Sequence, residues 1–462
     1  MKKESISVMV NATKQIPKER ILMMTTLTQN PLQFNRSIRL SYDGGDLSSD
    51  TGQLLFREFD EKIGFSRTIA KHLDVQDERT YCIHTNESLI QQKIYQLLAG
   101  YHEDDAADYL THDPVLTRIL DKPAVASQPS LSRLFKRIGS TGVKQMETAN
   151  RELLDQLHQR RNATELIIDL DSSYAETYGK QEQADYNHDY RVVGFHPLLA
   201  FDGLTGDFLK AQLRPGNVYT SKGVVDFVQP LCAHYNEKFP ETTMMVRGDS
   251  GFAVPGLYEL CESESIYYII RLKSNARLQA LAEELHPTSE IQDVTKAEYY
   301  VEESIYQANS WSIPRRIVIQ SVRPAGELFF HHTFFVTNLS ETTFSPQAIV
   351  TSYQKRGAME NFIKEAKEGF GFDQMKSHDF KRNEARMMIS LLAYNFTNWL
   401  RTLTFPTKQK RLQIQTIRIR IIKVASKLVK SSRYLHFKLA SSFVYAHFFA
   451  DVLTRVQQLL PY

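Results

Sequence analysis

The chain has 462 residues, of which 42% are hydrophobic and 24% are charged. This length exceeds one simple core, so we expect roughly two to four domains or subdomains in a folded protein. The three cysteines are far apart and lack the spacing of a disulfide scaffold or a zinc site, which fits a reducing compartment.

The N-terminus shows no signal peptide, and no stretch reaches the ~18 apolar residues of a membrane span. We therefore expect a cytoplasmic protein with no membrane partner. The net charge is only +3, but it is unevenly spread. Between Lys376 and Lys438 there are 15 Lys or Arg and two acids, a local balance of +13. This asymmetry indicates that one part of the molecule meets a polyanion.

The first half of the chain is mostly helical in pattern. Residues 1–34 are polar and irregular and predict a flexible tail. Residues 35–162 contain several segments with helical periodicity, including "ESLIQQKIYQLLAG" and "VKQMETANRELLDQLHQRR". They predict a mostly helical N-terminal domain, which we expect to bind DNA if the basic helix around 130–138 faces it.

The pattern changes at Leu166. Residues 163–275 predict three strands, then helix, strand, helix and strand. This order is that of a ribonuclease H-like core, an α/β fold with a mixed sheet flanked by helices. Residues 276–345 alternate β-branched and aromatic residues with breakers and predict an inserted antiparallel β subdomain. The core resumes over 346–400, and 401–462 predict a basic helical C-terminal region.

Four side chains share one face of the helix predicted after residue 345. Tyr353, Arg356, Glu360 and Lys367 fall within a stripe about 60° wide at 100° per residue. A carboxylate flanked by fixed cations and a phenol suits a site that holds a metal ion and phosphates. An ordinary solvated helix face is the alternative interpretation.

Two further carboxylates end predicted core strands. Asp171 closes "IIDLD" and Asp249 closes "MVRGD". Carboxyl ends of neighbouring strands meet at one sheet edge, where the helix can add Glu360. Because three carboxylates repel in a site of low dielectric, we expect two Mg²⁺ ions, with Mn²⁺ as an alternative, among them. Asp169 faces the same side as Asp171 and is the alternative first ligand.

Two other groups of charged residues stand out in the sequence. The acidic cluster at 103–108 lies in a helical region, which favours solvated charge over a metal site. In the C-terminal region, helical spacing places four cations on one arc, opposite an apolar side, with no acid among them. This pattern predicts an amphipathic helix that contacts DNA phosphates through Arg420, Lys423, Lys427 and Lys430.

With these residues in place, the chain resembles a DDE-type bacterial insertion-sequence transposase. The resemblance is to the insertion-sequence family thirteen-eighty, within the group that shares the Y-x2-R-x3-E-x6-K helix. It rests on segments spread over residues 38–440: "SYDGGDLSSDTGQLLFREFDEKIG", "LAGYHEDDAADYL", "QPSLSRL", "IIDLDSSYAETYGKQEQADYNHDYRVVGFHPLLAF", "VRGDSGF" and "YQKRGAMENFIKEAKEGF".

The resemblance implies that Asp171, Asp249 and Glu360 are the metal-binding, catalytic triad and that Tyr353, Arg356 and Lys367 contact phosphates. One departure is Asp171-Ser172-Ser173, where the family commonly has Asp-x-Thr. The implied activity is cut-and-paste transposition by two-metal hydrolysis and strand transfer. Its partners would be double-stranded inverted-repeat ends and target DNA, met by a homodimer in a synaptic complex in a bacterial, nucleoid-associated setting.

Three questions stay open at this level. An inactive or domesticated transposase-derived DNA-binding protein, or a stand-alone ribonuclease H-like nuclease, would share many of these residues. Trp311, in the β insertion, could stack on a flipped base or pack as an ordinary core or surface residue.

Overall fold

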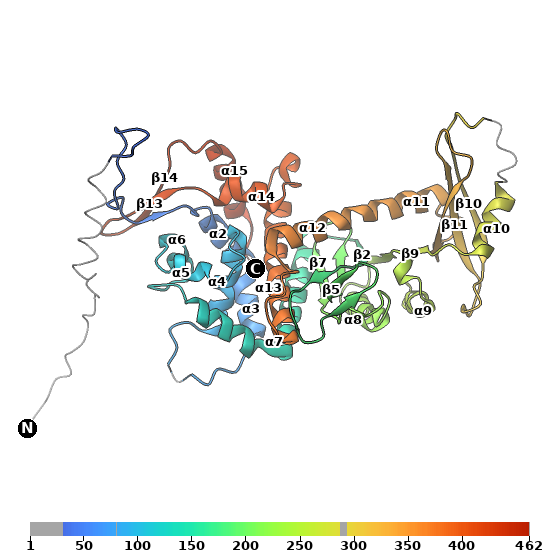
Figure 1. Cartoon of the computed structure of the whole chain (residues 1–462), viewed down its shortest axis with the longest axis horizontal. Coiled ribbons are helices and arrows are strands. Elements are labelled where there is room, and N and C mark those ends of the chain that lie inside the picture. The colour runs from blue at the N-terminus through green and yellow to red at the C-terminus, as the bar shows by residue number, and fades with distance from the viewer. Residues whose placement is uncertain (1–30, 80, 287–292, 462) are drawn as a thin grey trace, which may run out of the picture.

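The computed structural model describes residues 31–79, 81–286 and 293–461. The tail expected at 1–34 therefore lies almost entirely outside the described residues. The molecule is elongated, with a helical N-terminal part at one end and a group of long strands at the other (Figure 1). A mixed sheet lies between them.

Helices make up the N-terminal part, as predicted for 35–162. They are α2 (Gln53–Ile63), α3 (Phe65–His72), α4 (Asn86–Ala99), α5 (Ala106–Tyr109), α6 (Pro114–Ile119) and α7 (Gln128–Arg160). The long α7 bends at Gly139, whose φ of 53° is a conformation that glycine adopts without strain. Aromatic rings from this part, those of Phe56, Phe59 and Phe65, gather around Phe396 of the later helix α13 (Phe380–Thr404).

The central sheet has eight strands in the order β10-β11-β12-β9-β8-β2-β6-β7. Its first five in sequence are β2 (Glu165–Ser172), β6 (Leu198–Asp202), β7 (Phe208–Gln212), β8 (Thr243–Gly248) and β9 (Tyr267–Leu272). β2 pairs antiparallel with β6 and parallel with β8, so the sheet is mixed. Small strands β3 (Ala175–Glu176), β4 (Asp185–Asn187) and β5 (Val192–Phe195) form a separate sheet beside it.

The β-rich segment expected at 276–345 is present, and it joins the central sheet. After helix α10 (Ala276–Leu285) come the antiparallel strands β10 (Glu298–Tyr306), β11 (Arg315–Arg323) and β12 (His331–Thr337). β12 pairs with β9, which makes the insertion a continuation of the core sheet. Trp311 is buried against Tyr258 and Tyr306, so it packs in a core and is not free to stack on a base.

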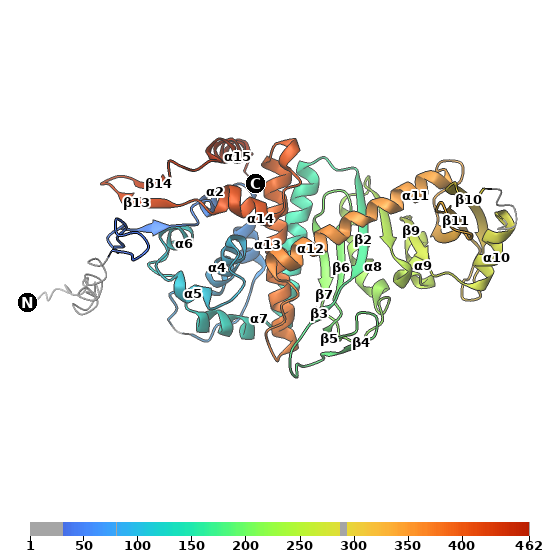
Figure 2. The ribbon, with the colours of Figure 1, turned by 45° about the horizontal axis from the view of Figure 1, so that its top comes forward.

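Helices cover and cross the sheet. α8 (Val224–Lys238) and α9 (Pro255–Ser263) follow β7 and β8. α11 (Pro346–Gln354) and α12 (Ala358–Phe370), joined by a tight helical turn at Lys355–Gly357, form one rod that runs along the sheet from the β10–β12 end (Figure 2). The buried α13 packs against both α7 and β7. It therefore joins the helical part to the sheet.

The prediction of a helical C-terminal region at 401–462 is wrong for the middle of that region. α14 (Ile414–Ile417) continues as a π-helical turn, Arg418–Ile422, and then the chain becomes extended in β13 (Ser426–Lys430) and β14 (Leu435–Leu439). β13 pairs with β1 (Leu47–Ser48), and only α15 (Ala446–Gln458) is helical beyond it. Among the described residues, no helix is both long enough and apolar enough to cross a membrane.

Candidate active site

Three chain segments bring the predicted carboxylates to one cleft. Asp171 is near the end of β2, and Asp249 follows the end of the neighbouring parallel strand β8. Glu360 lies in the first turn of α12, which passes over this edge. All three line one open cleft of about 570 Å³. The parallel pairing of β2 with β8 explains why their ends meet, as the sequence predicted.

The electrostatics of Asp171 reflect this crowding. Its side chain is 17% exposed. Its pKa is raised from 3.8 to about 6, chiefly by burial; the charges of Asp249 and Glu360 also raise it, and Arg356 lowers it. The backbone N–H of Ser172 donates to one of its oxygens, which favours the ionised form. A cation in the cleft would remove the cost of ionising this carboxyl.

Asp169, the alternative first ligand, is committed elsewhere. It is fully buried, and the Arg247 guanidinium donates to both of its oxygens at 2.6 and 2.7 Å. Arg247 stands directly opposite it on β8 and also donates to the carbonyl of Ser352 in α11. Asp169 therefore holds Arg247, which anchors α11, the helix that leads into α12, and Asp171 is the carboxylate that faces the cleft. Arg247, which stands two residues before Asp249, was not among the site residues predicted from the sequence.

The other residues of the helical stripe contact protein groups. Arg356 is buried, donates to the carbonyl of Leu170 at 2.6 Å and lies 3.4 Å from Asp171. Its Nε is buried without a hydrogen-bond partner among the described residues. Tyr353 packs on the ring of Phe335, with centroids 4.7 Å apart, and lines the cleft.

Lys367 lies further along α12, beside a second, smaller cavity of about 230 Å³ that Asp171 and Glu360 also line. Its ammonium donates to the carbonyl of Tyr174 at 2.7 Å, lies 3.8 Å from the centre of that ring, and is 3.8 Å from Asp373. The expected stripe thus follows the edge of two adjoining cavities. Arg271 of β9 also lines the larger cleft, which the sequence analysis did not foresee.

The donor set fits a hard divalent cation, because carboxylate oxygens are the ligands that such ions prefer. Within the part of the chain that the structure describes, no three His, Cys, Asp or Glu side chains are arranged to hold one ion together. The acids share a cleft and influence one another, yet Arg356 contacts Asp171 in it. Bringing all three onto one ion requires side-chain movement.

The four C-terminal cations do not share a helix face. Arg420 is in the π-helical turn with its guanidinium over the Tyr445 ring, and Lys423 binds Asp50 at 2.8 Å. Lys427 and Lys430 lie on β13, three residues apart, and so point to opposite faces of the strand. The predicted amphipathic helix is therefore wrong. Extended pairing with Leu47–Ser48 replaces it.

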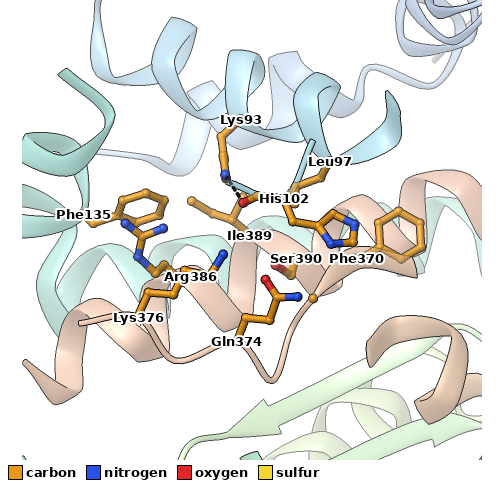
Figure 3. A pocket seen from close by; sticks show the side chains of 11 residues that line it. Lys93, Leu97, His102, Phe135, Phe370, Gln374, Lys376, Arg386, Ile389 and Ser390 are labelled. Carbon is orange, nitrogen blue, oxygen red and sulfur yellow. Dashed lines mark hydrogen bonds between the residues drawn. The ribbon is translucent and has the colours of Figure 1, made fainter. Parts of the chain in front are cut away.

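The acidic cluster at 103–108 is partly structural rather than solvated. Asp104 is buried and pairs with Lys93 of α4 and Arg386 of α13. Burial by itself raises the pKa of Asp104, but these two cations hold it below its ordinary value. Figure 3 shows a small pocket that Lys93 and Arg386 line. Arg386 lies over the Phe135 ring there, and His102 and Lys376 also line the pocket. These contacts join the N-terminal helices to α13.

A family model described as "Transposase DDE domain group 1" matches residues 30–461. The chain belongs to this family. It is a DNA transposase, an enzyme of metal-dependent DNA cleavage and strand transfer. This membership favours a transposase over a stand-alone nuclease. A search of curated proteins found no match.

Solved transposase structures are similar to this DDE transposase at low identity. A piggyBac transposase synaptic complex with hairpin DNA is 12% identical over 94% of this chain and 88% of that chain, with a TM-score of 0.42. The Mos1 mariner paired end complex with Mn is 13% identical over 46% of this chain and 68% of that chain, with a TM-score of 0.17. At these values, the description of the fold rests on the strands and helices themselves.

Proposed function

We propose that this transposase moves an insertion sequence of the family thirteen-eighty type by cut-and-paste transposition, with Asp171, Asp249 and Glu360 as its metal-binding triad. The observation that carries the proposal is that Asp171, Asp249 and Glu360 line one cleft where the parallel strands β2 and β8 end. The raised pKa of Asp171, to which burial and the charges of both other acids contribute, agrees with it. Carboxylates gathered at one open cleft are suited to a shared divalent cation, which neutralises their mutual repulsion. Two Mg²⁺ ions, with Mn²⁺ as a substitute, are the proposed cofactor.

The proposed catalytic core is ribonuclease H-like. Supporting this, the strands run β7-β6-β2-β8-β9, with the first three in sequence antiparallel and the next two parallel to β2. We assign the core to 163–275 and 346–400, the β insertion to 276–345, and a DNA-binding role to the helical part at 35–162. The partners would be inverted-repeat ends and target DNA, held by a homodimer in the bacterial cytoplasm.

The protein groups have distinct proposed tasks. When bound, the metal ions would activate water and then a 3′-hydroxyl for in-line attack and stabilise the leaving oxygen. Asp171, Asp249 and Glu360 hold them. Arg356 has two unequal partners, a carbonyl at 2.6 Å and Asp171 at 3.4 Å. Its weaker contact leaves it able to turn toward a phosphate once a cation neutralises Asp171, while Tyr353 and Lys367 bind phosphates on either side.

The test is cleavage of DNA that carries the flanking inverted repeats, with Mg²⁺, by wild type and by Asp249→Ala and Glu360→Gln. We expect both substitutions to abolish cutting while end binding stays near normal. Glu368→Gln is the matched control, because Glu368 is exposed on the same helix, lines the smaller cavity and pairs only loosely with Lys364 at 3.9 Å. Equal cutting by wild type and Asp249→Ala would rule the triad out.

A further inference from the structure

The β1–β13–β14 sheet has one face against the protein and one face outward. Ser426 and Leu428 are buried, and Phe437, the register partner of Leu428, packs on the core. The alternate residues, Lys427 on β13 and Lys438 on β14, are exposed. The strands project from the helical end of the molecule, away from β10–β12 (Figures 1 and 2). The outward face is therefore accessible to a large partner.

Two lysines stand directly opposite each other on this outward face. Lys427 and Lys438 are register partners in the antiparallel pair, and Val429 faces His436 in the next position on the same side. Like charges directly opposite on a sheet destabilise the pairing. Arg433, exposed in the connection between the strands, adds a third fixed cation. The arrangement costs stability unless an anion binds there.

Few acidic residues lie near these cations. The sequence has no Asp or Glu from residue 385 to residue 450. Across the sheet, Asp46 lies 3.9 Å from Lys430, which points to the other face. Asp43, fully exposed in the loop before β1, has its pKa lowered mainly by Ser41 and only slightly by Lys427. Within the described residues, no carboxylate lies within 4.0 Å of the ammonium of Lys427 or Lys438.

We propose that the outward face of the β13–β14 ribbon binds the phosphate backbone of duplex DNA through Lys427, Lys438 and Arg433. The inference rests on the family's action on DNA and adds a contact surface remote from the catalytic cleft. The cations of this ribbon match the negative charge of DNA phosphates, and a two-stranded ribbon is narrow enough to enter the major groove of B-DNA. A membrane surface fits less well, because this face lacks the Trp or Phe anchors that interfacial binding uses.

The test uses the full chain and a 30-bp duplex of arbitrary sequence, labelled for fluorescence anisotropy, at several salt concentrations. Each lost phosphate contact lowers the slope of log K against log salt by ~0.9, so Lys427→Ala/Lys438→Ala should lower it by about 1.8. Lys71→Ala/Lys296→Ala removes the same charge from exposed lysines elsewhere and should leave the slope unchanged. An unchanged slope in the ribbon variant, or an equal loss in the control, would overturn the proposal.

A single substitution separates binding from folding. Lys438→Gln removes the like-charge opposition, so we expect a Tm no lower than that of wild type together with a slope lower by ~0.9. A lower Tm with unchanged DNA binding would make Lys438 merely structural and would refute the inference. Binding of the wild type to anionic vesicles that the ribbon variant loses, with DNA affinity intact, would likewise refute it in favour of a membrane.

The same variants distinguish this inference from the proposed active site. Lys427→Ala/Lys438→Ala should raise the concentration of inverted-repeat DNA needed for half-maximal cutting, because DNA contacts are lost, whereas Asp249→Ala should not cut at any DNA concentration. If the wild type itself does not cut, the proposed triad fails while the salt-slope result still decides the role of the ribbon.

Discussion

Replacing Asp171 by Asn should make the metal-free protein more stable at neutral pH. The pKa of this carboxyl rises from 3.8 to about 6 on folding, chiefly through burial. At 1.36 kcal/mol per pKa unit, keeping it ionised in the folded state costs roughly 3 kcal/mol above pH 6. Because its side chain is only 17% exposed, solvent screening removes little of this cost.

The sign of the pH dependence follows from the raised pKa. Below pH 3.8 the carboxyl is protonated in both the folded and the unfolded chain, so Asp171 imposes no cost. As the pH rises from 3.8 to about 6, the unfolded chain loses this proton first and the wild type loses stability relative to Asp171→Asn. The difference in free energy of unfolding should therefore open across this window and stay constant above it.

Urea denaturation of both proteins at pH 4, 5 and 7.5, without divalent ions, measures this difference. Adding Mn²⁺ or Mg²⁺ at pH 7.5 should raise the stability of wild type and leave Asp171→Asn nearly unchanged, because the ion binds the ionised carboxylate. If Asp171→Asn is less stable than wild type at pH 7.5, or if its advantage does not vary with pH, the electrostatic reasoning for this site is wrong.

Three further substitutions test the framework around the site. Asp169→Ala leaves the buried Arg247 guanidinium without its carboxylate, so it should lower the free energy of unfolding by about 3–5 kcal/mol, as measured by urea denaturation. Asp171→Asn should instead raise it. Asp104→Asn should lower the free energy of unfolding by on the order of 3 kcal/mol, because Lys93 and Arg386 lose their shared anion. Asp105→Asn, at the exposed neighbouring position, should leave it nearly unchanged. Equal effects of the two substitutions would contradict the pairing. A Cβ on Gly52 would lie 1.7 Å from the Ile421 carbonyl oxygen, so Gly52→Ala should lower stability by about 2 kcal/mol. The helical Gly357, with no atom within 4 Å of its Cβ position, should tolerate alanine without loss.

The catalytic strands and the Glu360 helix could be predicted because their signals are local. An apolar run that ends in a carboxylate indicates a buried strand, and helical spacing placed Tyr353, Arg356, Glu360 and Lys367 on one rod. That β2 and β8 are parallel neighbours followed from the order of elements. The roles of these residues stay predictions until cleavage is measured.

The predictions that were wrong or incomplete concern segments whose structure depends on residues distant in sequence. Residues 417–430 carry apolar side chains at helical spacing, but Ser426–Lys430 also alternates as a strand, and pairing with Leu47–Ser48 decides for the strand. In the same way, only the pairing of β12 with β9 makes the insertion part of the core sheet. The burial of Asp104 and of Trp311 depends on Arg386 and on Tyr258, which no local pattern relates to them.

Arg247 links three of the elements that frame the site. One guanidinium holds Asp169 on β2, stands on β8 and grips the backbone of α11 at Ser352. Arg247, which does not line the cleft, therefore helps to fix the spacing between β2, β8 and the helix that leads to Glu360. A chimaera built from related transposases would therefore need to take β2, β8 and α11 from the same parent. A chimaera that separated them would lose the Arg247 contacts, and with them the relative positions of these elements.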